Sequence, residues 1–174
     1  MLILVLGGAR SGKSTVAEQI AERLPQPVTY LATLAADATD ADLERRIAAH
    51  RARRPAGWRT VDAGSDLVAE LEALPGTVLV DSLGPWVARH QPEPDVVDAF
   101  TAAVVARAGD TVVVSDEVGL SVHPTTAAGL AFRDRLGGVN SQLGAIADRV
   151  VLVVAGRVVA TAPLDVDAIV AGGH

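Results

Sequence analysis

Short apolar runs alternate with longer segments along this chain, and the alternation predicts its architecture. Runs of four to eight apolar residues are typical of buried strands, whereas apolar residues three and four positions apart indicate helices. Strands are predicted at residues 2–6, 28–32, 58–62, 77–81, 111–115, 150–154 and 158–161. Helices are predicted at 15–24, 40–54, 65–74, 96–108 and 125–147, with a loop at 91–95 and the last helix open to interruption at Gly137 and Gly138.

Strands that alternate with helices predict an α/β fold with a mainly parallel, twisted sheet and helices on both faces. The last two strands are separated only by Ala155, Gly156 and Arg157, which predicts an antiparallel hairpin at the sheet edge. Parallel strands bring their carboxyl ends to one edge of the sheet, and ligands of such folds bind there. We therefore expect a site near Gly7, Thr33, Asp81 and Asp116, each at or just after the end of a predicted strand.

The segment Gly7–Ser14 matches G-x-x-x-x-G-K-[ST], the phosphate-binding P-loop. It lies between a predicted strand and a predicted helix, as the motif requires, so a chance match of a glycine-rich turn is the weaker interpretation. Lys13, the only lysine in the chain, would reach the β- and γ-phosphates, and Ser14 would hold Mg²⁺. The candidate nucleotide-binding residues here are Gly7, Gly8, Ala9, Arg10, Ser11, Gly12, Lys13 and Ser14. The motif predicts a P-loop NTPase-type three-layer sandwich.

Two predicted strands end in acids that could share the metal with Ser14. Asp81 follows one apolar run, and Asp116 and Glu117 follow another. An acid at the carboxyl end of a neighbouring parallel strand is where P-loop proteins hold magnesium. We assign the metal to Asp81, and Asp116 and Glu117 remain alternatives.

His50 lies in the predicted helix 40–54, on the same face as Ile47, with several arginines in the last turn. Cations at a helix C-terminus interact favourably with its dipole. From spacing alone, a solvated basic helix end is the favoured interpretation, and a role in binding or catalysis is the alternative.

Composition narrows the class of protein. The chain has 174 residues and is expected to form one domain over 1–174, with the tail from about 163 weakly determined. A net charge of −6 argues against a nucleic-acid partner, and the lack of cysteine excludes disulfides and thiolate metal sites. Apolar runs are too short to span a membrane, and no signal peptide is recognised, so a cytoplasmic protein is expected.

Several stretches together resemble one enzyme family, the bifunctional adenosylcobinamide kinase / adenosylcobinamide-phosphate guanylyltransferase of cobalamin biosynthesis. The stretches are the P-loop, Tyr30-Leu31-Ala32-Thr33, Arg46-Ile47 with His50-Arg51, Arg54-Pro55, Trp58-Arg59-Thr60, Val78-Leu79-Val80-Asp81, Glu117-Val118-Gly119, Phe132-Arg133-Asp134 and Ala147-Asp148. The resemblance covers residues 2 to about 160, and the part from Arg46 to Thr60 is the most specific.

The resemblance implies two reactions. An NTP phosphorylates the hydroxyl of adenosylcobinamide, with ATP and GTP both open as donors. GTP then transfers GMP to a histidine that aligns with His50, and adenosylcobinamide phosphate takes the GMP to give adenosylcobinamide-GDP. Further nucleotide contacts are implied at Thr33, Leu34, Ala35, Arg51, Ala52, Arg53, Arg54 and Asp62. The family also implies a homo-oligomer, a trimer.

The chain departs from the family pattern at a few positions. Asp116 replaces a usual asparagine, Gly84 a common threonine, Ser141 a usual glutamine, and Leu34-Ala35 a more polar pair. Two other functions stay open from the residues themselves: a P-loop kinase of another small metabolite in which His50 is structural, and an NTP-binding regulatory protein without transfer chemistry.

Overall fold

One sheet of seven strands organises the molecule. The structure, a computed structural model, describes residues 1–34, 41–63 and 66–162. Its strands are β1 (Leu2–Gly7), β2 (Val28–Ala32), β3 (Arg59–Asp62), β4 (Thr77–Asp81), β5 (Thr111–Asp116), β6 (Arg149–Val154) and β7 (Arg157–Ala160). They lie in the order β3-β2-β4-β5-β1-β6-β7, and all neighbours are parallel except the hairpin of β6 and β7. The predicted parallel sheet with an antiparallel edge is confirmed.

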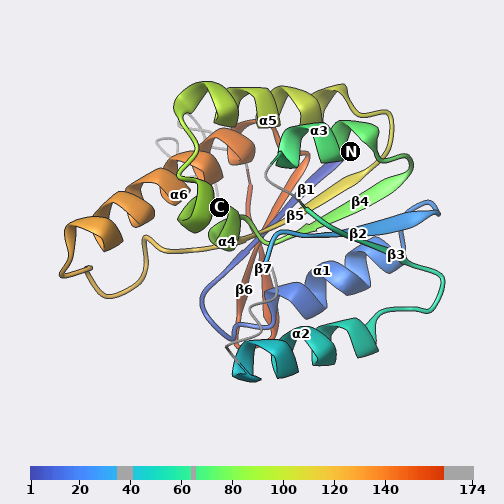
Figure 1. Cartoon of the computed structure of the whole chain (residues 1–174), viewed down its shortest axis with the longest axis horizontal. Coiled ribbons are helices and arrows are strands. Elements are labelled where there is room, and N and C mark those ends of the chain that lie inside the picture. Colours follow the sequence, from blue (N-terminus) through green and yellow to red (C-terminus); the bar gives the residue numbers. More distant parts are fainter. Residues whose placement is uncertain (35–40, 64–65, 163–174) are drawn as a thin grey trace, which may run out of the picture.

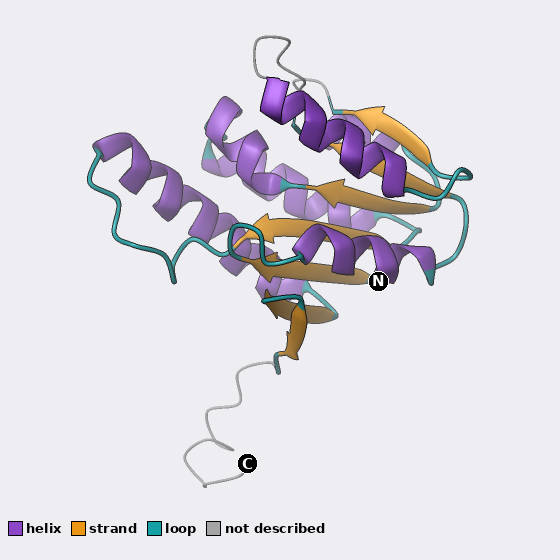
Figure 2. Cartoon of the chain, turned by 90° about the horizontal axis from the view of Figure 1, so that it is seen from below, coloured by secondary structure: helices purple, strands orange, loops and turns teal. Residues whose placement is uncertain are grey.

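Helices cover both faces of this sheet (Figure 1). They are α1 (Lys13–Glu22), α2 (Ala41–Arg53), α3 (Leu67–Ala73), α4 (Leu83–His90), α5 (Pro94–Ala106) and α6 (Ala127–Ile146). Figure 1 shows α1 and α2 on one side and α3 to α6 on the other, which gives the predicted three layers. The turned view shows that α6 and the loop before it extend beyond the sheet (Figure 2). No helix of the described residues is long and apolar enough to cross a bilayer.

The strand side chains divide between two apolar cores because successive residues of a strand point to opposite faces. In β4, Val78 and Val80 belong to the core under α3 to α6, whereas Leu79 belongs to the core under α1. Valine, leucine, isoleucine and alanine supply most of both cores, and Phe100 and Trp86 pack with ring centroids 5.6 Å apart. Both faces of the sheet are thus sealed, and its strand ends are left as the place for a site.

All five predicted helices differ by one or two residues at their ends from the observed ones. Helix α1 begins at Lys13 and ends at Glu22, two residues before the predicted 15–24 at each end. Helix α3 is capped by Asp66, whose side chain accepts from the Ala69 N–H, and Ser65, the first residue of the predicted helix 65–74, lies outside the described residues. Helix α6 starts at Ala127 and runs through Gly137 and Gly138 without interruption.

Between β4 and β5 the structure differs from the sequence prediction in two places, the loop at 91–95 and helix α4. The predicted loop 91–95 includes the start of α5, because Pro94 occupies the first turn of that helix, where its missing N–H costs nothing. Helix α4 was not predicted at all. It is short and contains Gly84 and Pro85, but its buried Trp86 and Val87 pack into the core against α6.

Arg107 joins α3 to the start of β5, and we expect Arg107→Met to lower the free energy of unfolding by about 2–4 kcal/mol. Its guanidinium donates to the carbonyls of Leu71, Leu74 and Gly76 at 2.6–2.7 Å, and Nε donates to Thr111. Burial lowers the pKa of Arg107, and these acceptors offset the cost of burying its charge. Methionine keeps the apolar stem but leaves the carbonyls unpaired.

Urea unfolding of the purified variant measures this loss. The matched control is Arg89→Met, which removes an exposed arginine from the last turn of α4. Equal stability of the Arg107 variant and the wild type would show that these hydrogen bonds do not hold the two segments together.

Candidate functional site

The loop between β1 and α1 has the backbone that a P-loop needs. Gly12 adopts a φ of 94°, a left-handed conformation that glycine takes without strain, and it caps the start of α1. At Gly7, an added Cβ would lie 2.8 Å from the carbonyl oxygen of Val153 on β6 and would also clash with Ser11. Both motif glycines are therefore required by geometry. Together they place the N-terminus of α1, with its free N–H groups, at the carboxyl end of the sheet.

Lys13 and Ser14 each contact an acid at the end of a neighbouring strand. Lys13 Nζ lies 2.7 Å from Oδ1 of Asp116 and donates to the Gly8 carbonyl at 3.3 Å. The Ser14 hydroxyl donates to Oδ1 of Asp81 at 3.3 Å. The two strand-end acids thus have different partners, the lysine for Asp116 and the serine for Asp81.

Tyr30, the only tyrosine of the chain, fixes the other oxygen of Asp81. Its hydroxyl donates to Oδ2 of Asp81 at 2.6 Å, and the Arg54 guanidinium stacks 3.2 Å above the ring centroid. Burial and the neighbouring charge of Asp81 raise the pKa of Tyr30 well above its ordinary value. The phenol therefore stays protonated and remains a donor to Asp81 at neutral pH.

His50 projects from α2 toward α1, where it meets a buried carboxylate and an arginine. Nδ1 of His50 lies 4.0 Å from Oε1 of Glu18 and 3.2 Å from Nη2 of Arg53. Arg53 also lies 3.5 Å from Glu18. Burial raises the pKa of Glu18, although the Arg53 guanidinium opposes the shift. Arginine only donates hydrogen bonds, so its contact with Nδ1 fits an imidazole that is unprotonated at this nitrogen.

These groups surround one cavity of about 540 Å³ at the carboxyl ends of the strands. Its lining comprises Arg10, Ser11, Gly12, Lys13, Ser14, Thr15, Tyr30, Ala32, Leu34, Ile47, His50, Arg51, Arg53, Arg54, Asp62, Asp81, Ser82, Pro85 and Asp116. The helix N-terminus, one lysine and four arginines of this lining favour a ligand with several negative charges. Asp81 and Asp116 offer hard oxygen ligands, and His50 offers a nucleophilic nitrogen.

Residues 3–161 match the model of a protein family described as cobinamide kinase / cobinamide phosphate guanyltransferase. The chain belongs to this family. A relative in Pseudomonas aeruginosa, the bifunctional adenosylcobalamin biosynthesis protein CobP, is 39% identical over 88% of this chain and 92% of its own length. The bifunctional adenosylcobalamin biosynthesis protein CobU of Salmonella typhimurium is 35% identical over 90% of this chain and 97% of its own.

Solved structures agree with the fold. A protein from Pyrococcus horikoshii OT3 superposes with a TM-score of 0.54 at 10% identity, covering 95% of this chain and 88% of that one. An ATPase of a bacterial type III secretion system gives a TM-score of 0.51 at 11% identity, covering 98% of this chain and 54% of the other. The fold of this chain is therefore the three-layer sandwich of P-loop NTPases.

Most of the predicted site residues meet in the P-loop cavity, including His50, for which local spacing alone favoured a solvated helix end. Others lie elsewhere. Gly7, Gly8, Ala9 and Ala52 are not among the lining residues, and Ala35 lies outside the described residues. The Thr33 hydroxyl is buried and donates to the carbonyl of Ser82. Glu117 lines a different cavity, so among the three candidate acids Asp81 and Asp116 face the P-loop.

Sequence reasoning missed Tyr30 and Glu18. Glu18 had a signal, because it follows Ser14 by four residues and so lies on the same face of α1. A buried acid on that face indicates that a basic side chain from a neighbouring element pairs with it, and this side chain is Arg53 of α2. Tyr30 lies in one of the stretches that resemble the family, but its role depends on the pairing of β2 with β4, which places Ala32 opposite Asp81.

Two departures from the family pattern meet in the structure. A Cβ added at Gly84 would collide with the carboxylate of Asp116, the residue that stands where the family usually has asparagine. The glycine on α4 leaves the space in which this carboxylate reaches Lys13. A threonine at position 84 would require the Asp116 side chain to turn away, so the two departures are structurally linked.

Proposed function

We propose that the P-loop cavity binds a nucleoside triphosphate and carries out both reactions of the cobinamide kinase / guanyltransferase family. The observation that carries this proposal is that a P-loop lysine and a histidine line the same cavity. The lysine suits transfer of the terminal phosphoryl group, and the histidine suits a covalent nucleotidyl intermediate. A simple P-loop kinase would need the first but not the second.

In the kinase reaction, the hydroxyl oxygen of adenosylcobinamide attacks the γ-phosphorus of an NTP. The bond from that phosphorus to the β,γ-bridging oxygen breaks, the nucleoside diphosphate leaves, and the hydroxyl proton is released to solvent. Lys13 neutralises the negative charge that builds on the phosphates. When the nucleotide binds, the lysine exchanges its ion pair with Asp116 for one with a phosphate oxygen. ATP and GTP both fit this step as donors.

In the guanylyl transfer, a ring nitrogen of His50 attacks the α-phosphorus of GTP and pyrophosphate leaves. A phosphate oxygen of adenosylcobinamide phosphate then attacks the same phosphorus, breaks the N–P bond and returns the histidine free. Arg51, Arg53 and Arg54 line the cavity from the end of α2 and can neutralise the triphosphate. The nucleophile must be unprotonated, which is the state that the Arg53 contact fits.

The donors around Ser14 and Asp81 fit Mg²⁺. A hydroxyl and a carboxylate 3.3 Å apart are hard oxygen ligands, and this ion usually combines one or two protein ligands with phosphates and water. No group of three or more acidic or histidine side chains that could hold a metal by itself occurs among the described residues. When bound, the ion would neutralise phosphate charge. Tyr30 would hold Asp81 in place for it.

Asp81→Asn is expected to raise the magnesium concentration needed for half-maximal activity more than Asp116→Asn does. The amide keeps the shape of Asp81 but loses the charge beside Ser14, whereas Asp116 contacts Lys13 instead. Titration of MgCl₂ at fixed GTP measures both variants. A larger rise in the required magnesium concentration for Asp116→Asn would assign the metal to Asp116 at the end of β5.

The kinase reaction is tested by incubating the protein with γ-labelled ATP or GTP and adenosylcobinamide. We expect label on the corrinoid. Label that remains on the nucleotide would favour the alternative of an NTP-binding regulatory protein.

We also propose that the chain assembles with copies of itself. Val154, Val158 and Val159 of the edge hairpin are each about half exposed, and β7 has no second neighbour in the described sheet. An exposed apolar edge strand presents unpaired N–H and C=O groups with which another chain can pair. A trimer is the assembly that the family resemblance favours, and light scattering of the purified protein measures it.

A further inference from the structure

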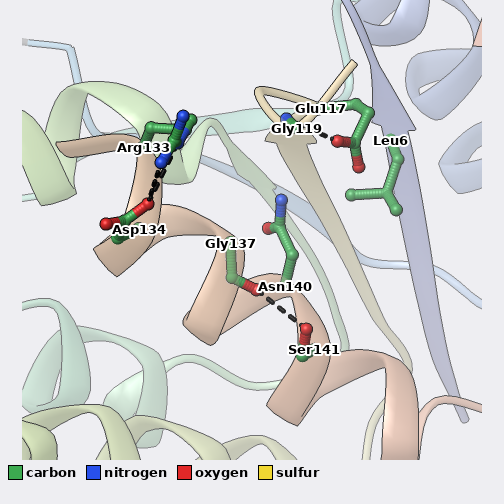
Figure 3. A pocket seen from close by; sticks show the side chains of 8 residues that line it. All are labelled: Leu6, Glu117, Gly119, Arg133, Asp134, Gly137, Asn140 and Ser141. Atoms are coloured by element: carbon green, nitrogen blue, oxygen red, sulfur yellow. Dashed lines mark hydrogen bonds and ion pairs between the residues drawn. The ribbon is translucent and has the colours of Figure 1, made fainter. Parts of the chain in front are cut away.

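A second cavity lies between α6 and the ends of β1 and β5. Its volume is about 720 Å³, and it is lined by Leu6, Glu117, Gly119, Arg133, Asp134, Gly137, Asn140 and Ser141 (Figure 3). None of these residues lines the P-loop cavity. Figure 3 shows Asn140 rising from α6 toward the strand ends, with Leu6 and Glu117 on one side and Arg133 on the other.

The charges of this cavity disfavour a nucleotide. Glu117 and Asp134 contribute two carboxylates against the single guanidinium of Arg133, and Arg133 is already paired with Asp134 at 2.7 Å. A triphosphate would meet uncompensated negative charge here, in contrast to the arginine-rich P-loop cavity. The cavity therefore suits a neutral or cationic ligand that both donates and accepts hydrogen bonds.

Asn140 gives a second, independent sign of a ligand. The residue is 8% exposed, and its amide nitrogen donates to the Asp116 carbonyl at 3.0 Å. Its Oδ1 is buried and accepts no hydrogen bond from the residues that the structure describes. A buried carbonyl oxygen without a donor is costly, so a donor supplied by a ligand would be stabilising.

The two cavities are separated by the end of a single strand. Asp116 faces Lys13 in the P-loop cavity, while the next residue, Glu117, lines the second cavity and donates its N–H to the Gly7 carbonyl at 3.1 Å. A ligand held in the second cavity could thus extend a flexible arm over the strand end toward the phosphates. The acceptor in a phosphoryl transfer must make this approach.

We propose that the second cavity holds the body of the acceptor, a cationic corrinoid whose side chains end in primary amides. This inference rests on the proposed function. Amide N–H groups would donate to Asn140 Oδ1 and to Glu117, and amide carbonyls would accept from Arg133. The alcohol arm of the corrinoid would reach past Asp116 to the nucleotide.

Gly137→Leu tests the assignment by filling the cavity. A Cβ at Gly137 meets nothing within 4 Å, and leucine is a better helix former than glycine, so α6 should fold at least as well. The matched control is Gly138→Leu, which is equally unobstructed and does not line the cavity. We expect the KM for adenosylcobinamide to rise at least tenfold in Gly137→Leu and to stay within twofold of wild type in Gly138→Leu.

Covalent labelling of the protein by GTP alone needs no acceptor and should be equal in the wild type and both variants. An unchanged KM in Gly137→Leu, with normal labelling, would overturn the acceptor site and leave the proposed function intact. A wild type that neither labels nor modifies adenosylcobinamide would instead overturn the proposed function itself. Glu117→Gln should also raise the KM for adenosylcobinamide but not the KM for GTP. A rise in the KM for GTP alone would place the nucleotide, not the corrinoid, at this cavity.

Discussion

Lys13→Ala should reduce both phosphoryl and guanylyl transfer by at least about 100-fold while the fold is retained. The side chain extends from the start of α1 into the P-loop cavity, and its partners are a carbonyl and the Asp116 carboxylate, not the apolar core. Its loss removes the cation that would neutralise the charge building on the phosphates. Steady-state rates with adenosylcobinamide and GTP measure the effect, and circular dichroism checks the fold.

Two control variants separate charge at the P-loop from charge in general. Arg23→Ala removes an exposed cation at the other end of α1 and should keep the wild-type rate. Lys13→Arg keeps the charge but replaces a compact ammonium by a planar fork, and it should remain strongly impaired. Near-wild-type turnover by Lys13→Ala would mean that this loop does not act as a P-loop.

His50→Asn should abolish the guanylyl-enzyme and lower guanylyl transfer by at least about 10⁴-fold, because it removes the nucleophile itself. Asparagine is similar in size and can still accept from Arg53, so the contacts of α2 with α1 should persist. Phosphorylation of adenosylcobinamide should survive in part, since it depends on Lys13 and Ser14 and not on a covalent histidine. GTP labelled at the α-phosphate should leave acid-labile, base-stable label on the wild type, and γ-label should not remain.

The matched control is His90→Asn, an exposed histidine at the end of α4 that does not line the cavity. It should label like the wild type. Persistent α-label on His50→Asn would identify another residue as the nucleophile. Equal loss of kinase and transferase activities would indicate that His50 is needed for the shape of the cavity.

The P-loop and the sheet could be predicted from the sequence because their determinants are local. The P-loop motif is contiguous in the sequence, Gly12 is required by its own left-handed backbone, and apolar runs such as 77–81 are sufficient to indicate strands buried on both faces. The position of Asp81 at a strand end could be predicted for the same reason, whereas its role as a magnesium ligand stays a prediction. The contact with Ser14 is consistent with that assignment.

The parts that could not be predicted depend on contacts between distant segments. Helix α4 contains Gly84 and Pro85, which disfavour a helix locally, and the packing of Trp86 and Val87 overrides them. His50 gave only a basic helix end from its spacing, because nothing local shows that α2 lies beside α1. The cavity beneath α6 likewise requires the strand order, which brings β5 next to β1.

Mass spectrometry of the products formed from adenosylcobinamide, GTP and MgCl₂ by the purified protein tests the central claim most directly. The account predicts that the corrinoid gains the mass of one phosphate and then of GMP, with pyrophosphate released in the second step. A corrinoid that gains the phosphate but never the GMP would show a simple kinase in which His50 has no covalent role. A corrinoid of unchanged mass would contradict both reactions.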